Sequence, residues 1–536
     1  MKRRHLVPMA VAALAVSTGV SLAVPITSGA ASAEVHRPTG PRVAGVNIDA
    51  KTIPQLERLM NRHRLSSVQL VRFYVNRIHT LNPKLHAVIT VNPKAVALAR
   101  RADRRRAHGD RRPLLGIPVM VKDNIDTTGM PTTAGSLALK GSMPPDAFIV
   151  RRLKKQGALI IGKANLSEWA NFRSTQSSSG WSAVGGQTNS AYVLDRNPCG
   201  SSAGSGVAAS VDLATVAIGT ETDGSIVCPS GQNGDVGIKP TLGLASRTGI
   251  VPISAEQDTP GPITRNVTDA AVVLGALTGV DRHDPATKAQ RGHVFKNYTR
   301  FLRKNALKGA RIGIWRKGNF GLSPETDRVM RRAIARLKKL GAKIVDPANI
   351  KIGPAFGPET TALDFEFKHD IGKYLRTFTK PGYPKSLKGL IRFNRHHRAK
   401  EMHWFGQEIF LAAQATGPLT SPKYKKARHQ ATSIARHAIN STMRKFNLDA
   451  ILAPTNSPAW TTDLVNGDHF SIGTSTPSAV AGFPDLTVPA GYADHLPIGM
   501  SLIGRKWSEP KLIALAYSWE QATHIRRMPH LRPTLP

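Results

Sequence analysis

The chain has 536 residues, 41% of them hydrophobic and 20% charged, and its 74 Lys and Arg against 35 Asp and Glu give a formal net charge of +39. This is a globular composition, which excludes disordered and collagen-like proteins. The only cysteines are Cys199 and Cys228, too few for a disulfide scaffold or a cysteine-rich zinc site, so we expect stability from a buried core, no metal and no cofactor.

The N-terminus has the pattern of an export signal. Basic residues at positions 2–4 precede an apolar run over 9–24, and Ala31-Ser32-Ala33 follows with the small residues that a signal peptidase accepts. We expect residues 1–33 to be a signal peptide, cut after Ala33, and 34–46 to be a linker rich in Pro and Gly. The mature protein is then secreted or periplasmic, by the general secretory or the twin-arginine route.

An uncleaved membrane anchor is the alternative for this N-terminal segment. Its apolar run is shorter than the about 20 residues that a membrane-spanning helix needs. No later stretch of the sequence is long and apolar enough to span a bilayer. We therefore expect no stable membrane span.

The first helix is expected to start at Ser67 as its cap, to carry apolar residues at helical spacing, and to end before Pro83. Short apolar runs that follow predict buried strands, interspersed with helical stretches. They cover 117–121, 158–161, 213–218, 312–315, 450–452, 486–488 and 500–503. This alternation predicts an α/β fold with a mixed, helix-covered central sheet.

Two later segments have clear patterns. A helix should open at Ser323-Pro324, close near Gly341 and lead into a strand at 343–345. Residues 355–445 are charged and helical in pattern, so we expect a mostly helical insertion or cap. The expected organisation is one large domain over 47–536.

The positive charge is densest at 100–112, 392–400 and 423–428. A solvated basic surface is the favoured interpretation, and electrostatic contact with an anionic cell wall is the functional alternative. No zinc-finger spacing or RNA-binding signature accompanies the charge, so we expect no specific nucleic-acid partner. His396, His397 and His403 lack carboxylates at a metal-binding spacing and are interpreted as surface residues.

Chemistry is expected at Lys122, which ends the apolar strand at 117–121. A lysine held out of water there loses the preference for its charged form and can act as a neutral base. An exposed lysine at a strand end is the structural alternative.

Two Gly- and Ser-rich loops favour an activated serine. They are CGSSAGSG at 199–206 and GTETDGSIVCPS at 219–230, where the turn at Gly224-Ser225 can aim backbone N–H groups at an oxyanion. No histidine occurs between His108 and His283. Lys122 is therefore the better candidate for the base, although a histidine from a distant segment stays open.

Two motif matches are interpreted as coincidences. Residues 200–204 fit a Gly-x-Ser-x-Gly nucleophile elbow, but a turn-like segment and no strand precedes them. Residues 157–163 approach a phosphate-binding loop, yet their interior is apolar and strand-like. Nucleotide binding is not expected.

The segments GIPVMVKDN, GSSAGSG, GTETDGSIVCP and GIKPTLG together resemble the amidase signature family, and YVLDRNPCGSS and TETDGSIVCP are most similar to its bacterial peptide amidase branch. The resemblance implies a single amidase-signature-type domain with a Ser-Ser-Lys triad. Ser225 matches the nucleophile, Ser201 the bridging serine that follows a cis peptide, and Lys122 the base. The backbone N–H groups of Thr222, Asp223, Gly224 and Ser225 match the oxyanion loop.

The expected function is an exported amidase that releases ammonia from a small amide or an amidated peptide, with aryl, aliphatic or fatty amides as alternative substrates. A transamidosome role is disfavoured because of the export signal. The alternative of another class is a basic binding protein for cell wall or polyanions on an inactive amidase scaffold. Cys199 and Cys228 flank the two serines, and we favour two buried thiols over a disulfide.

Overall fold

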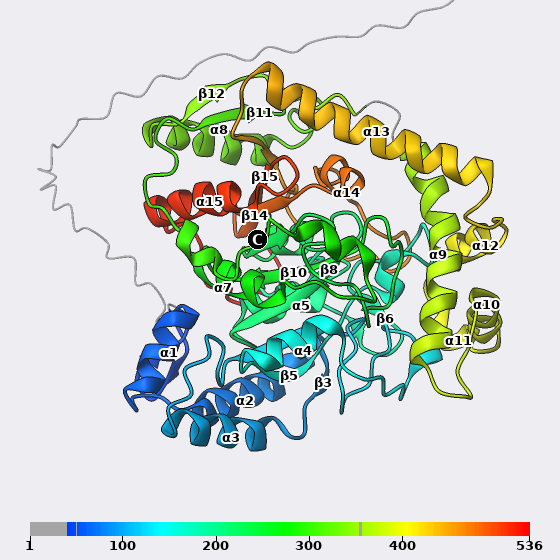
Figure 1. The fold of residues 1–536 in the computed structure, drawn as a ribbon, viewed down its shortest axis with the longest axis horizontal. Helices are drawn as coiled ribbons and strands as arrows, with labels where there is room; N and C mark the ends of the chain where they lie inside the picture. The colour runs from blue at the N-terminus through cyan, green and yellow to red at the C-terminus, as the bar shows by residue number, and fades with distance from the viewer. Residues whose placement is uncertain (1–39, 50, 353–355, 536) are drawn as a thin grey trace, which may run out of the picture. The chain divides into compact units, whose positions relative to one another are not determined.

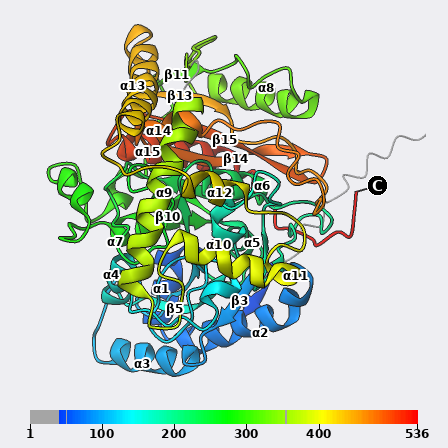
Figure 2. The same ribbon diagram turned by 90° about the vertical axis from the view of Figure 1, so that its right-hand side faces the viewer.

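The computed structural model describes residues 40–49, 51–352 and 356–535, and it is shown from two sides in Figures 1 and 2. The predicted signal peptide at 1–33 and its cleavage site lie outside the described residues. The last residues of the predicted linker are structured, because β1 (Arg42–Val43) pairs with β2 (Val46–Asn47). Within the described ranges, every helix is too short or too polar to cross a bilayer.

The fold is built on one 11-stranded sheet in which parallel and antiparallel pairs are mixed. The strand order is β12-β11-β13-β15-β14-β9-β10-β8-β4-β5-β3. The predicted mixed sheet is confirmed. Its strands are β3 (Val88–Val91), β4 (Pro118–Lys122), β5 (Leu159–Ala164), β8 (Val216–Glu221), β9 (Val236–Lys239), β10 (Thr259–Thr264), β11 (Arg311–Ile314), β12 (Lys343–Val345), β13 (Ala450–Pro454), β14 (Asp485–Ala493) and β15 (Leu496–Ile503). The short β6 (Trp181–Ser182) and β7 (Gly186–Gln187) pair outside it.

Each predicted strand overlaps an observed one. The boundary errors are largest at β14, which extends to Ala493, and at β15, which begins at Leu496. The start of β8 was also wrong. The prediction began at Leu213, whereas the strand starts at Val216. Leu213 still belongs to the turn that ends α5, because its N–H donates to the carbonyl of Ala208 and Asp212 has φ of 58°. A short apolar run does not distinguish a strand from a buried turn.

Helices cover the sheet (Figure 1). Outside the 355–445 region they are α1 (Ile53–Asn61), α2 (Ser67–Leu85), α3 (Ala95–Ala107), α4 (Phe148–Lys155), α5 (Ala203–Ser210), α6 (Val227–Gln232), α7 (Val267–Leu277), α8 (Pro324–Lys339), α14 (Thr476–Ala481) and α15 (Glu509–Thr523). The predicted helix from Ser323 to near Gly341 and the strand after it are confirmed as α8 and β12.

The predicted cap of α2 was wrong by one residue, and its predicted end before Pro83 was wrong by three. The cap is Ser66, whose Oγ accepts from the N–H of Gln69 while the Gln69 side chain accepts from the Ser66 N–H. Ser67 is instead the first helical residue. Pro83 lies inside the last turn, and the helix continues past it to Leu85.

Residues 355–445 are mostly helical, as predicted, and lie between β12 and β13 in the chain. The elements are α9 (Phe356–Phe378), α10 (Leu387–His396), α11 (Arg398–Glu401), α12 (Glu408–Gln414) and α13 (Pro422–Lys445). Their apolar residues, among them Leu363, Phe367 and Phe410, share one hydrophobic cluster with residues of the main domain such as Leu139 and Trp169. α9 lies beside the sheet, and α13 packs across one end of α9 (Figures 1 and 2).

The expectation of a purely solvated basic surface is wrong at two arginines. Arg106 is only 4% exposed and pairs with Glu57 at 2.7 Å. Arg428 of α13 pairs with Glu366 of α9 at 2.6 Å, with side-chain exposures of 11% and 1%. Arg106 therefore ties α3 to α1, and Arg428 ties α13 to α9. The three predicted surface histidines, His396, His397 and His403, are exposed.

Candidate active site

Lys122 is the last residue of β4 and is fully buried. β4 runs parallel to β8, so the C-terminal end of β4 lies beside Thr220 near the end of β8. The Lys122 Nζ donates to the Ser201 Oγ at 2.7 Å, the Thr220 Oγ1 at 3.0 Å and the Thr220 carbonyl at 3.2 Å. The exposed alternative is wrong, and Thr220 is a partner that the sequence did not reveal.

Burial lowers the pKa of Lys122 from 10.5 to about 7. Removal of water disfavours the ammonium form, and the carboxylates of Asp258 and Glu221 oppose the change by favouring it. A lysine with this pKa is partly neutral near neutral pH. It can then accept a proton from a hydroxyl that it contacts.

Ser201 follows a cis peptide bond from Gly200 and precedes α5. Its side chain is fully buried, and its carbonyl accepts from the Ser167 N–H at 3.0 Å. The cis bond that the resemblance implied is present. Ser201 and Lys122 are therefore in contact although 79 residues separate them.

The neighbouring serines, Ser202 and Ser205, bind the backbone of β8. Ser202 Oγ donates to the Thr220 carbonyl at 3.1 Å, and Ser205 Oγ donates to the Ile218 carbonyl at 3.1 Å. Both side chains are fully buried against β8. The elbow-like sequence at 200–204 is therefore a packing motif, and no strand precedes it directly.

Ser225 lies just before α6 and is 8% exposed, in contrast to the fully buried Ser201 and Lys122. Its carbonyl accepts from the Ser202 N–H at 3.2 Å, which brings the second serine loop beside the first. In the described part of the chain no hydrogen bond joins the hydroxyls of Ser201 and Ser225. Catalytic hydrogen bonds are often loose before substrate binds. Of the three predicted triad residues, Ser225 is the one with solvent access.

Glu221 fixes the turn that carries Ser225. Its Oε2 accepts from the N–H groups of Ile226 and Val227 at 2.8 Å and 3.0 Å. Burial raises the pKa of Glu221, and the nearby Lys239 ammonium lowers it. A carboxylate at this position therefore holds the backbone on the C-terminal side of Ser225.

The predicted oxyanion loop, Thr222 to Ser225, is tied by its side chains. The Thr222 Oγ1 donates to Asp258 Oδ1 at 2.6 Å. The Asp223 carboxylate accepts from the hydroxyls of Ser475 and, at 2.6 Å, Thr476. Gly224 has φ of 80°, a left-handed conformation that glycine adopts without strain. These contacts leave the backbone N–H groups of the loop without a protein acceptor among the described residues.

A second layer behind this loop was missed by the sequence reasoning. The Gln257 Nε2 donates to the Thr222 carbonyl at 3.3 Å and to Glu359 Oε1 at 2.9 Å, and its Oε1 accepts from Arg428 at 2.7 Å. Glu359 and Arg428 come from α9 and α13. The helical region therefore contacts the loop through one buried glutamine. The residues that make these contacts are far apart in the sequence, and no local motif connects them.

Cys199 and Cys228 form a disulfide with a Cα–Cα distance of 6.0 Å. The favoured prediction of two free thiols was wrong, and the alternative was right. The reason is the turn geometry, which brings the residue before Gly200 next to the first turn of α6. The sequence placed both cysteines near the serines but did not give this distance.

The phosphate-loop resemblance at 157–163 has a structural explanation. This segment leads into β5, and Lys163 is fully buried, where it pairs with Asp123 at 3.1 Å and donates to Thr132 Oγ1 at 2.8 Å. Lys163 is held by protein groups alone. Within the described ranges, no group of three or more His, Cys, Asp and Glu is placed to hold a metal ion.

Asp223→Ala should lower both the stability of the protein and the rate of amide hydrolysis. The change removes an acceptor for two hydroxyls, and hydrogen bonds to a charged group contribute about 1.5–3 kcal/mol each. We expect the free energy of unfolding to fall by about 2 kcal/mol or more, together with kcat, since the peptide N–H groups on both sides of residue 223 lose their anchor. Urea unfolding and steady-state kinetics measure both quantities.

Thr476→Val is the matched control, because it removes only one of the two hydroxyls that bind Asp223. It should have a smaller effect in both measurements. Wild-type stability in Asp223→Ala would contradict the anchoring role.

The comparisons with known proteins agree with this geometry. The family model for Amidase matches residues 69–513. A protein of Arabidopsis thaliana described as a probable amidase is 40% identical over 496 residues, covering 90% of this chain and 92% of its own. The structure of native peptide amidase from Stenotrophomonas maltophilia is 45% identical with a TM-score of 0.86, and the match covers 90% of this chain and 99% of that one.

A second structure, of the peptide amidase PAM in complex with the competitive inhibitor chymostatin, is 45% identical, with a TM-score of 0.87 and coverage of 90% and 99%. A glutamyl-tRNA(Gln) amidotransferase component of Thermoanaerobacter pseudethanolicus is 31% identical over 497 residues, which cover 89% of this chain and 97% of that one. These matches show that the chain is an amidase, a hydrolase that acts on amides. The chain belongs to the amidase signature family.

Proposed function

We propose that the protein hydrolyses the C-terminal carboxamide of peptides through a Ser225 acyl-enzyme, with Ser201 and Lys122 as a proton relay. The observation that carries this proposal is the 2.7 Å contact between the buried Lys122 and Ser201, beside the solvent-accessible Ser225. The similarity to structures titled peptide amidase, at 45% identity over 90% of this chain, supports the substrate class.

In the relay, neutral Lys122 accepts the proton of Ser201 as Ser201 accepts that of Ser225. The Ser225 Oγ attacks the amide carbonyl, and the backbone N–H groups of Thr222, Asp223, Gly224 and Ser225 stabilise the oxyanion. The relay then returns a proton to the nitrogen, the C–N bond breaks and ammonia leaves. Water then attacks the acyl-enzyme and gives a proton to the same relay. The relay returns a proton to the Ser225 Oγ, and the free acid leaves.

Release of ammonia, or of the aromatic amine where the substrate is an anilide, tests the substrate class across a panel of amides. The panel contains C-terminally amidated dipeptides, free amino acid amides, fatty amides and an anilide, each also run with Ser225→Ala. We expect ammonia from the dipeptide amides at the highest kcat/KM and none with the variant. Preference for the anilide or the fatty amides would identify an amidase of another substrate class. If no substrate releases an amine, the inactive binding protein is favoured.

We also propose that the protein is exported, with cleavage after Ala33. The disulfide supports an oxidising compartment, because such bonds are rare in reducing cytoplasm. This proposal disfavours a transamidosome role, despite the similarity to a glutamyl-tRNA(Gln) amidotransferase component. N-terminal sequencing of the secreted protein should begin at Glu34, and a protein found only inside cells would contradict export.

The large positive charge supports electrostatic contact with an anionic cell wall. Counterion release makes such binding strongly dependent on salt. Retention of the mature protein on purified anionic wall polymer should therefore fall steeply as salt rises. Salt-independent retention, or none at low salt, would contradict this contact.

A further inference from the structure

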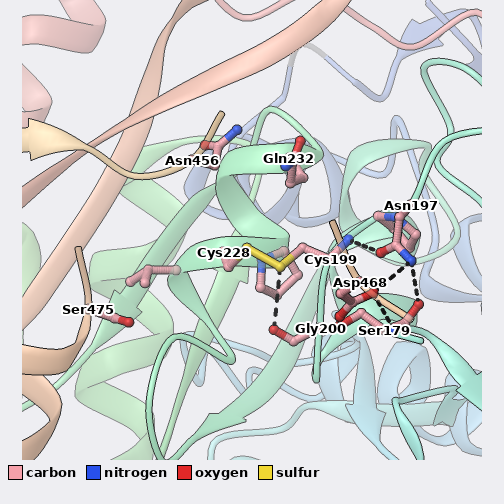
Figure 3. Close-up of a disulfide and its surroundings, with 12 residues drawn as sticks. Ser179, Asn197, Cys199, Gly200, Cys228, Gln232, Asn456, Asp468 and Ser475 are labelled. Carbon is pink, nitrogen blue, oxygen red and sulfur yellow. Dashed lines mark hydrogen bonds between the residues drawn. A yellow bond between two sulfur atoms is a disulfide. The ribbon is translucent and has the colours of Figure 1, made fainter. Parts of the chain in front are cut away.

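The disulfide joins the two loops that carry the predicted serines. Cys199 lies two residues before Ser201, and Cys228 lies three residues after Ser225. Figure 3 shows the bond between the segment that leads to Gly200 and the first turn of α6. The two half-cystines are 4% and 5% exposed, and they pack against Trp460.

On the first side, the disulfide is attached to a well-anchored segment. The Cys199 N–H donates to Asn197 Oδ1 at 2.8 Å, and the Asn197 Nδ2 donates to the Ser179 carbonyl at 2.9 Å (Figure 3). The Ser179 N–H in turn donates to Asp468 Oδ1 at 2.8 Å. The segment before Ser201 is therefore fixed to two other parts of the chain.

On the second side, the disulfide holds the turn of the nucleophile. The Cys228 N–H donates to the Gly224 carbonyl at 2.8 Å, so residue 228 closes the turn that contains Ser225. Besides the disulfide, hydrogen bonds also join the two loops. The Ser202 N–H donates to the Ser225 carbonyl at 3.2 Å, and the Ser202 Oγ bonds the backbone of Thr220, at the start of the second loop. The Asn233 Nδ2 donates to the carbonyls of Pro198 and Pro229 at 3.0 Å and 2.8 Å, but the disulfide is the covalent tie. Both loops are rich in Gly and Ser, which restrain a backbone weakly.

Proton transfer between two hydroxyls requires an oxygen–oxygen distance within hydrogen-bond reach. A misplacement of about 1 Å can lower a rate by about 100-fold. A relay that crosses from one loop to another therefore depends on how firmly the loops are joined. Ser201, which contacts Lys122, belongs to the loop of Cys199, whereas Ser225 belongs to the loop of Cys228.

We propose that the Cys199–Cys228 disulfide is a positioning element of the relay, which sets kcat by holding Ser225 in register with Ser201. This inference rests on the proposed Ser-Ser-Lys function. It also makes the activity redox-dependent: a dithiol reductant supplies two electrons and two protons, converts the bond to two thiols and is itself oxidised to a cyclic disulfide. The enzyme then keeps its substrate-binding surface but loses alignment of the serines.

The test compares the oxidised wild type, the reduced wild type and the double variant Cys199→Ser/Cys228→Ser. Because the bond is buried, dithiothreitol is applied in urea below the unfolding transition until a thiol reagent counts two thiols per chain. Each sample is then assayed in the same buffer on an amidated dipeptide. We expect kcat to fall about 10- to 100-fold in both samples that lack the bond, while KM changes little.

Reoxidation should restore the kcat of the wild type but not that of the double variant, and reductant should not affect the double variant further. Circular dichroism of every sample measures the folded fraction, and kcat is expressed per folded molecule. If the double variant does not fold, the reduced wild type decides the question. An unchanged kcat with two free thiols, or a loss confined to KM, would overturn the proposal.

Failure of this inference and failure of the proposed function give different results. If Ser225→Ala is inactive while the reduced wild type keeps full kcat, the relay stands and the disulfide has only a structural role. If Ser225→Ala retains full activity, the proposed function itself is wrong, whatever the effect of reduction.

Discussion

Ser225→Ala should abolish ammonia release from an amidated dipeptide while leaving the protein folded. In the proposed relay this side chain supplies the attacking oxygen, and removal of a serine nucleophile in comparable hydrolases lowers kcat by a factor on the order of 10⁶. The Ser225 hydroxyl makes no hydrogen bond within the described part of the chain, so its loss should cost little stability. Steady-state ammonia release and thermal unfolding measure the two effects.

Ser202→Ala is the matched control for this variant. Ser202 lies in the adjacent loop and is fully buried, but its hydroxyl bonds only the backbone of Thr220. It should destabilise the protein more than Ser225→Ala and retain far more activity. Substantial turnover by Ser225→Ala would show that another residue attacks the amide.

Lys122→Met should also remove activity, because methionine fills the buried site but accepts no proton. The wild type should show an acid limb in kcat/KM with a midpoint near the Lys122 pKa of about 7, since only neutral lysine serves as the base. We expect kcat to fall by about 10³-fold or more. A pH series of ammonia release on both proteins measures the limb and the loss.

The same residue determines part of the pH dependence of stability. The folded pKa of Lys122 is lowered from 10.5 to about 7, so between these values the unfolded chain binds more protons than the folded one. The contribution of Lys122 to the free energy of unfolding therefore rises as the pH rises from about 7 to 10.5. Lys122→Met should lose this rise, and urea unfolding across the range would detect it.

Asp258→Asn serves as an electrostatic control. The Asp258 carboxylate favours the ammonium form of Lys122, so its neutralisation should lower the Lys122 pKa and move the acid limb to lower pH. An asparagine can still accept from the backbone N–H groups of Ile253 and Ser254. An acid limb that stays in place, or that persists in Lys122→Met, would contradict the assignment of this limb to Lys122.

The central sheet was largely predictable because most of its strands are buried apolar runs, whereas β3 and β12 at its two edges are partly exposed. The buried pattern of β4, followed by Lys122, is visible in the sequence and located both a strand and a candidate base. Boundaries were less predictable where a turn was equally apolar, as at Leu213. The α2 cap was missed because Ser66 and Ser67 are adjacent and only the contact with Gln69 distinguishes them.

The site was predictable in its residue types but not in its supports. Local composition singled out Lys122 and the two Gly- and Ser-rich loops, and the resemblance to the amidase signature family assigned Ser201 and Ser225 within them. Gln257, Glu359 and Arg428 have no local signal, since their roles come from contacts across 35 to 171 residues. The disulfide likewise depends on a Cα–Cα distance that only the folded turns produce.

The most direct test of the central claim is to locate the acyl group on the enzyme. The protein is mixed with the p-nitrophenyl ester of an N-acylated dipeptide, quenched in acid within milliseconds, digested and mapped by mass spectrometry. The account predicts a stoichiometric burst of p-nitrophenolate and an acyl group on Ser225, absent in Ser225→Ala. An acyl group on any other residue, or turnover with no covalent intermediate, would contradict it.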